Sequence, residues 1–239
     1  MSLKVSMNSA AAQSSDAPRI DQDNHLWLEF WRDQRSDFHQ SVVNPLLTKF
    51  WPELGLAQGS RVFVPLCGKS LDMLWLAQQG HEVIGIELSP VAVEAFFSEN
   101  GLQPTQQQVG AFTLWRDGRI SILCGDYFAL TKADLGMIDT VYDRSALTAL
   151  PEEIRNEYVA QLSRLVSDTA VVFLLTVEDA AKDATMQQAT GVDEEIARLY
   201  STGFEIELTF VESVFEADPE SASLPDIRAE YKVYRLTSR

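Results

Sequence analysis

From residue 61 onward, the chain alternates short apolar runs with longer segments in which apolar residues recur every three or four positions. Short apolar runs bounded by turn residues are typical of strands, and the longer spacing is typical of amphipathic helices. The pattern predicts seven strands, at residues 61–66, 82–88, 120–126, 138–143, 170–176, 204–211 and 230–236. It also predicts four helices, at residues 70–79, 90–100, 152–165 and 193–201.

The central strands are almost entirely apolar, as at Val62-Phe63-Val64 and in residues 170–175. Such strands are buried on both faces, in a parallel sheet that helices cover on both sides. The last two strands follow each other without a helix between them, which indicates an antiparallel pair at one edge. We therefore predict a three-layer, Rossmann-like α/β fold with a mostly parallel seven-stranded sheet and an antiparallel edge hairpin.

The segment before residue 61 has a different pattern. Leu, Phe, Trp and Val show helical spacing in residues 26–30 and 42–50, which predicts an N-terminal helical cap around a polar loop. Residues 1–17 are rich in Ser and Ala and contain no apolar signal core. We expect a flexible tail at residues 1–20 and a single domain at residues 21–239, of which residues 21–58 form the cap.

Composition narrows the classes of partner. The 19 basic and 35 acidic residues give a net charge of −16, which disfavours nucleic acids and anionic membranes because both bind basic surfaces. Two cysteines and three widely spaced histidines provide neither a disulfide framework nor a metal site. No apolar run is long enough to span a membrane. We expect a cytoplasmic protein and, by default, a monomer.

The first strand is followed by the loop Pro65-Leu66-Cys67-Gly68-Lys69-Ser70, and the second ends at Glu87. A loop after strand one and an acid after strand two are the arrangement that holds a nucleotide-type ribose over a parallel sheet. The loop has one glycine and no phosphate-binding pattern, which favours an adenosine ligand without phosphates, such as S-adenosyl-L-methionine. Glu87 can accept hydrogen bonds from both ribose hydroxyls; the alternative is a charge at the start of the following helix.

Other polar residues follow the third and fourth strands, where a ligand over the sheet would lie. Asp126 can accept from an adenine amino group and Tyr127 can pack on its ring, although a turn acid and a core aromatic explain them equally well. Arg144 can hold a thiolate or carboxylate, or can simply pair with Asp143. His39 is a candidate general base or a packing residue.

The remaining candidates have plainer interpretations. Cys67 and Cys124 have no histidine near them in sequence, so we expect both to be buried small hydrophobes. Lys69 follows Gly68 as in a phosphate loop, but the upstream glycine is missing, so we expect a solvated lysine at a helix start.

In these residues and their spacing, the chain resembles the thiopurine S-methyltransferase family, in particular its bacterial members, from about residue 27 to residue 200. The resemblance rests on four motifs: Phe38-His39 followed by Val43-Asn44-Pro45-Leu46-Leu47, Val64-Pro65-Leu66-Cys67-Gly68-Lys69-Ser70, Gly85-Ile86-Glu87-Leu88-Ser89, and Tyr142-Asp143-Arg144-Ser145-Ala146-Leu147.

The resemblance implies a class I methyltransferase that uses S-adenosyl-L-methionine. It implies a front segment that closes over the cofactor, and an acceptor pocket lined at Phe38 and His39. Arg144 is the implied catalytic residue, next to the reacting centre. The implied cofactor contacts are Trp31, Leu66, Glu87, Asp126, Tyr127 and Arg144.

The family methylates aromatic and heterocyclic thiols, and some bacterial relatives methylate selenium or tellurium species. The segment after strand five departs from the family pattern over residues 177–191, on the side where the acceptor binds. We therefore predict transfer of a methyl group to the sulfur of a small aromatic or heterocyclic thiol. The alternatives are a selenium, tellurium or halide methyltransferase, and a cofactor-binding protein that has lost the acceptor chemistry.

Overall fold

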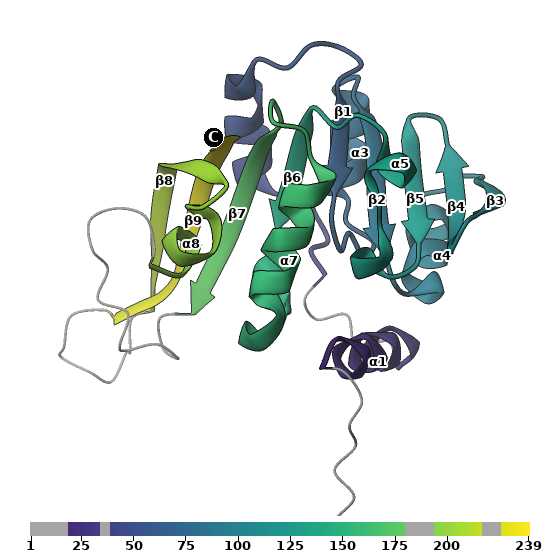
Figure 1. Cartoon of the computed structure of the whole chain (residues 1–239), viewed down its shortest axis with the longest axis horizontal. Coiled ribbons are helices and arrows are strands. Elements are labelled where there is room, and N and C mark those ends of the chain that lie inside the picture. The colour runs from purple at the N-terminus through teal and green to yellow at the C-terminus, as the bar shows by residue number, and fades with distance from the viewer. Residues whose placement is uncertain (1–18, 34–38, 180–193, 217–225) are drawn as a thin grey trace, which may run out of the picture.

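A nine-stranded sheet forms the centre of the protein in a computed structural model, which describes residues 19–33, 39–179, 194–216 and 226–239 (Figure 1). The strand order is β3-β4-β5-β2-β1-β6-β7-β9-β8. The strands are β1 (Arg61–Val64), β2 (Glu82–Glu87), β3 (Thr105–Val109), β4 (Phe112–Asp117), β5 (Ile120–Cys124), β6 (Thr140–Arg144), β7 (Val171–Asp179), β8 (Phe204–Glu216) and β9 (Asp226–Ser238).

The five central strands, β5-β2-β1-β6-β7, run parallel to one another. Strand β9 pairs antiparallel with β7 and with β8, which confirms the predicted antiparallel hairpin at one edge. All seven predicted strands are present. The predicted number of strands is wrong, however, because β3 and β4 form a second antiparallel hairpin that extends the sheet beyond β5.

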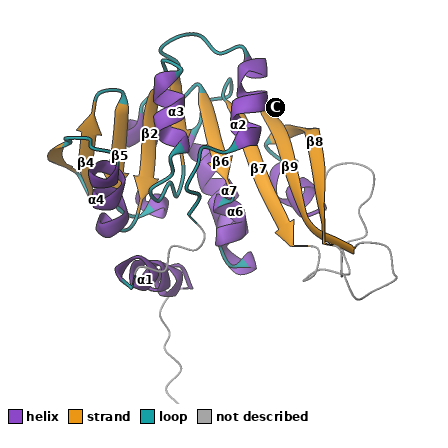
Figure 2. Ribbon diagram, turned by 180° about the vertical axis from the view of Figure 1, so that it is seen from behind, coloured by secondary structure: helices purple, strands orange, loops and turns teal. Residues whose placement is uncertain are grey.

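Helices cover both faces of the sheet, as a buried parallel sheet requires. Figure 1 shows α5, α7 and α8 on one face, and Figure 2 shows α2, α3 and α4 on the other. The helices are α1 (Arg19–Arg32), α2 (Pro45–Phe50), α3 (Asp72–Gln78), α4 (Pro90–Glu99), α5 (Lys132–Leu135), α6 (Ala146–Ala149), α7 (Glu152–Leu165) and α8 (Glu194–Tyr200), with short 3-10 turns η1 (Trp51–Leu54) and η2 (Tyr127–Ala129).

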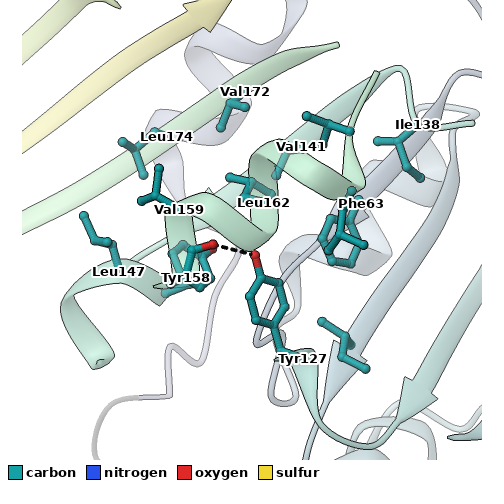
Figure 3. Close-up of a cluster of buried hydrophobic side chains, with 14 of the residues drawn as sticks. Phe63, Tyr127, Ile138, Val141, Leu147, Tyr158, Val159, Leu162, Val172 and Leu174 are labelled. Carbon is teal, nitrogen blue, oxygen red and sulfur yellow. Dashed lines mark hydrogen bonds between the residues drawn. The ribbon is translucent and has the colours of Figure 1, made fainter. Parts of the chain in front are cut away.

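Each helical layer has its own hydrophobic core. On the α7 side, β-strand residues such as Phe63, Val141 and Leu174 pack against Tyr158 and Leu162 of α7 (Figure 3). On the other side, the core joins α2, α3 and α4 to the opposite faces of the same strands. Because both faces of the central strands are buried, the apolar runs of the sequence are continuous rather than alternating.

Helix α1 of the N-terminal segment lies below the sheet, at the carboxyl end of the parallel strands (Figure 1). Helix α1 is longer than the predicted span of residues 26–30 and begins at Arg19, two residues earlier than the expected domain boundary. Asn44 begins α2 by accepting hydrogen bonds from the backbone N–H groups of Leu46 and Leu47. The rest of the predicted tail, residues 1–18, lies outside the described residues.

Candidate active site

A cavity of about 310 Å3 opens at the carboxyl end of the parallel strands. The topology of the sheet places ligands there, beyond the strand ends. The cavity brings together every predicted site residue that the structure describes: Trp31, His39, Leu66, Glu87, Asp126, Tyr127 and Arg144. Phe38, the other predicted acceptor residue, lies outside the described residues.

The loop after β1 is held in an unusual backbone conformation. Leu66 has a φ of 45° and Gly68 a φ of 51°, both in the left-handed region. A non-glycine residue such as Leu66 occupies that region at a cost of about 1–3 kcal/mol, and such strain is concentrated at functional sites. A Cβ at position 68 would lie 3.1 Å from the Trp31 ring, so Gly68 allows the indole to pack directly on the loop.

Glu87 lies at the end of β2 and is buried, with only 6% of its surface exposed. Its Oε2 accepts from the Gly68 backbone N–H at 2.9 Å, and its Oε1 accepts from the Ser89 backbone N–H at 2.7 Å. Burial raises the pKa of Glu87 to about 7, against the lowering effect of these two hydrogen bonds. Each oxygen retains acceptor capacity, because an ionised carboxylate accepts about four hydrogen bonds.

Asp126 and Tyr127 follow β5, but their side chains have different environments. Asp126 caps η2 by accepting from the Phe128 backbone N–H at 2.9 Å, and it also lines the cavity. The Tyr127 ring stacks on Tyr158 with centroids 4.9 Å apart, and its hydroxyl donates to the Tyr158 carbonyl at 3.0 Å. Tyr127 is therefore a core aromatic at the cavity wall, and its contact with an adenine ring stays a prediction.

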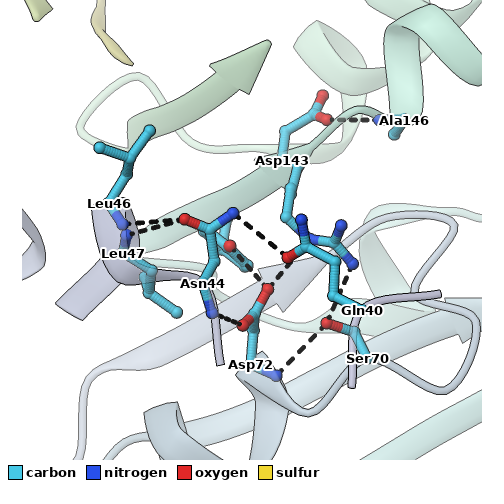
Figure 4. A network of polar contacts seen from close by, with 10 residues as sticks. Gln40, Asn44, Leu46, Leu47, Ser70, Asp72, Asp143 and Ala146 are labelled. Atoms are coloured by element: carbon cyan, nitrogen blue, oxygen red, sulfur yellow. Dashed lines mark hydrogen bonds and ion pairs between the residues drawn. The ribbon is translucent and has the colours of Figure 1, made fainter. Parts of the chain in front are cut away.

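Arg144 ends β6 and is held by Asp72 rather than by Asp143. The Arg144 Nε lies 3.0 Å from Asp72 Oδ2, and a terminal nitrogen donates to Ser70 Oγ at 3.4 Å. Figure 4 shows the polar network around Asp72 and Ser70. Asp143 instead accepts from the Tyr158 hydroxyl at 2.7 Å and from the Ala146 backbone N–H. The alternative Asp143–Arg144 ion pair is therefore not the contact that the structure forms.

Asp72 connects three separate elements, and sequence analysis missed it. Its Oδ1 accepts from the Asn44 backbone N–H, and its Oδ2 accepts from the Tyr142 hydroxyl, both at 2.8 Å. Together with the Arg144 ion pair, these contacts tie the N-terminal cap to β6 through the first turn of α3. An acid two residues after Ser70 is the only sequence signal for it.

His39 lines the cavity close to two basic side chains, Lys69 and Arg144. Burial lowers the pKa of His39, and the charge of Lys69 lowers it further, while Glu99 opposes this effect. These effects favour the neutral imidazole and make it a weaker base than an unperturbed histidine side chain. The expectation of a solvated Lys69 is wrong: its side chain is largely buried, and its Nζ lies 2.8 Å from both Glu99 carboxylate oxygens.

Neither cysteine has the environment of a reactive thiol. Cys67 is buried, and burial raises its pKa well above the ordinary value. Burial also raises the pKa of Cys124 to about 11. Among the residues that the structure describes, no cluster of His, Cys, Asp and Glu could hold a metal ion. In the same part of the chain, no helix is long and apolar enough to cross a membrane.

The arrangement of strands and helices is the Rossmann-like class I fold found in S-adenosyl-L-methionine-dependent methyltransferases. The structure is similar to magnesium protoporphyrin IX methyltransferase from Synechocystis with bound SAM, at a TM-score of 0.59 and 16% identity, covering 94% of this chain and 100% of that one. A SAM-dependent methyltransferase from Anabaena variabilis matches with the same TM-score at 14% identity, covering 94% and 96% of the two chains.

Sequence comparison then gives the family. The sequence profile described as thiopurine S-methyltransferase matches residues 22–239. A thiopurine S-methyltransferase from Stutzerimonas stutzeri is 65% identical over 219 residues, covering 92% of each chain. One from Methylococcus capsulatus is 41% identical, covering 91% of this chain and 98% of that one. The chain belongs to the thiopurine S-methyltransferase family, and its cofactor is S-adenosyl-L-methionine.

Proposed function

We propose that this enzyme transfers the methyl group of S-adenosyl-L-methionine to the sulfur of a small aromatic or heterocyclic thiol. The observation that carries the proposal is the placement of Arg144 and His39 in the same cavity as Glu87. This cavity offers an acid for a ribose, a cation for an anionic sulfur and a neutral imidazole for a proton. A heterocyclic thiol is a ligand that uses the cation and the imidazole.

The residues present fit the cofactor. Glu87 holds two backbone N–H groups and retains acceptor capacity for two hydroxyls. The loop that it organises contains a single glycine, so it provides no nest for phosphates, in keeping with a ligand that has none. When bound, the cofactor would supply an electrophilic methyl group on a sulfonium, and the neutral thioether released on transfer is a good leaving group.

With such a donor, the protein mainly positions the acceptor and excludes water. We propose that Arg144 holds the anionic thiolate, and that the Asp72 carboxylate keeps the guanidinium in place. His39, which lines the same cavity, takes up the proton of a thiol that arrives protonated. Asp143 does not share this role, because it is fully buried and bonded to Tyr158.

The acceptor is tested by a screen with isotopically labelled cofactor. The panel contains aromatic thiols, thiopurines, selenite, tellurite and halides, and labelled methyl product is quantified for each. We expect the aromatic and heterocyclic thiols to give the highest kcat/KM. Higher values for the selenium, tellurium or halide acceptors would overturn the proposed acceptor. Cofactor binding without product from any acceptor would indicate a protein that has lost the chemistry.

We also propose that the enzyme acts as a cytoplasmic monomer. The acidic net charge of −16 supports a monomer, because like charges oppose self-association. The two free cysteines support the cytoplasm, because a reducing compartment keeps thiols free. Sedimentation velocity at several protein concentrations tests the oligomeric state.

A further inference from the structure

One buried carboxylate of the cavity has no role in the mechanism above. Asp23 lies on the face of α1 that Asn24, Trp27 and Trp31 also present to the cavity. These positions recur every three to four residues, so they lie on one side of the helix. Asp23 is only 8% exposed, although ordinary surface aspartates on a helix of this kind lie in water.

Among the residues that the structure describes, Asp23 has few partners for a buried acid. The Trp27 side chain donates a hydrogen bond to it, and burial raises its pKa. Across residues 19–33, 39–179, 194–216 and 226–239, the cavity's basic side chains are engaged elsewhere: Lys69 pairs with Glu99 and Arg144 pairs with Asp72. One hydrogen bond leaves most of the acceptor capacity of a carboxylate unused, and burial without compensation is unfavourable.

The other two acids that line the cavity are accounted for by contacts of their own. Glu87 accepts two backbone N–H groups, and Asp126 caps η2 through the Phe128 backbone N–H. The helix dipole does not explain Asp23 either. It is the fifth residue of α1, beyond the first turn in which the dipole is effective, and an exposed acid would serve that purpose equally well.

We propose that Asp23 is a binding residue for an N–H donor or protonated amine of a small molecule in the cavity. Two molecules of the proposed reaction carry this chemistry. The cofactor has an amino group on its methionine part, and a heterocyclic acceptor has ring N–H groups. If the ligand is the heterocyclic acceptor, the inference rests on the proposed function. If the ligand is the cofactor, the inference is independent of it.

The test compares Asp23→Asn and Asp23→Ala with Glu29→Gln. Glu29 is on the same helix, but its side chain is 39% exposed and pairs with His25 and Arg32 outside the cavity. Calorimetry gives the Kd of S-adenosylhomocysteine and of an analogue that lacks the amino group. Steady-state kinetics give KM for a thiopurine with its ring N–H groups and for its N-methylated derivative. Asp23→Asn preserves the shape of the side chain, so it stays informative if Asp23→Ala fails to fold.

We expect Asp23→Asn to weaken one ligand about tenfold or more, as loss of a hydrogen bond to a charged group does. If the cofactor is the source, only the ligand that carries the amino group is affected. If the acceptor is the source, only KM for the thiopurine with ring N–H groups rises. Glu29→Gln should change none of these values.

Two outcomes overturn the inference. One is that every Kd and KM stays within twofold of wild type. The other is that Asp23→Asn weakens the intact ligands and the analogues without the N–H donors equally, which would show that Asp23 only positions α1. A change in the Kd of S-adenosylhomocysteine, together with no methyl transfer to any thiol, would support the role of Asp23 while refuting the proposed acceptor.

Discussion

Cofactor binding should release a proton from Glu87, and Glu87→Gln should abolish that release. Burial raises the pKa of Glu87 to about 7, so about half of the cofactor-free molecules carry a proton on this side chain at neutral pH. Ribose hydroxyls that donate to the carboxylate favour its charged form and lower the pKa. A ligand that needs the ionised carboxylate therefore displaces the proton.

The size of the effect follows from the pKa. With a value of about 7, binding releases about 0.9 proton at pH 6, about 0.5 at pH 7 and almost none at pH 8.5. The apparent Kd should then be about tenfold higher at pH 6 than at pH 8.5, which is about 1.4 kcal/mol. Glu87→Gln removes the charge and leaves one of the backbone N–H groups of Gly68 and Ser89 without an acceptor. Its Kd at pH 8.5 should rise at least tenfold.

The assay is titration calorimetry with S-adenosylhomocysteine at three pH values, each in two buffers with different ionisation enthalpies. The difference between buffers gives the number of protons released. The matched control is Glu82→Gln, which changes the exposed acid at the other end of the same strand. Proton release that is equal in wild type and Glu87→Gln, or a Kd for Glu87→Gln within twofold of wild type at pH 8.5, would refute the assignment of Glu87 to the ribose.

Three further changes test other parts of the site. Arg144→Lys should lower kcat/KM at least tenfold, because an ammonium cannot reproduce the planar guanidinium contact; unchanged turnover across the thiol panel would contradict its catalytic role. Asp72→Asn breaks a buried pair with Arg144 and should lower the free energy of unfolding by about 3–5 kcal/mol in urea titrations, whereas a loss below 1 kcal/mol would argue against it. Gly85→Ala places a Cβ 2.7 Å from Cys67 Sγ and should cost about 1–3 kcal/mol. Adding Cys67→Ala should recover much of that loss, and no recovery would show that the sulfur contact is not its cause.

The second hairpin shows why part of the fold was not predictable. The side chains of β3, Thr105-Gln106-Gln107-Gln108-Val109, are almost all exposed, so the strand has no alternation of apolar and polar residues. Backbone pairing with β4 holds it in the sheet, and backbone hydrogen bonds leave no mark in a hydrophobic pattern. The glycines at residues 110 and 118, both with positive φ, were the available turn signals.

The residues of the site were also predictable only in part. The positions of Glu87 and Arg144 in the cavity were predictable because both residues end parallel strands, and the carboxyl ends of such strands meet at one edge of the sheet. Asp72 and Asp23 lie on helices, where many acids are surface residues. Only their burial distinguishes them from surface acids, since Asp72 is 1% exposed and Asp23 is 8% exposed.

By itself, the sequence determined the alternating architecture, the edge hairpin of β8 and β9, the adenosine-type ligand and the family. These are local properties, because apolar runs, turn residues and a motif such as Pro65-Leu66-Cys67-Gly68 can be recognised within short stretches. Only the tertiary structure decided that Arg144 pairs with Asp72 and that Asp143 accepts a hydrogen bond from Tyr158. It also decided that α1 brings the buried carboxylate of Asp23 to the cavity. Those outcomes depend on which side chains, far apart in the chain, are buried together.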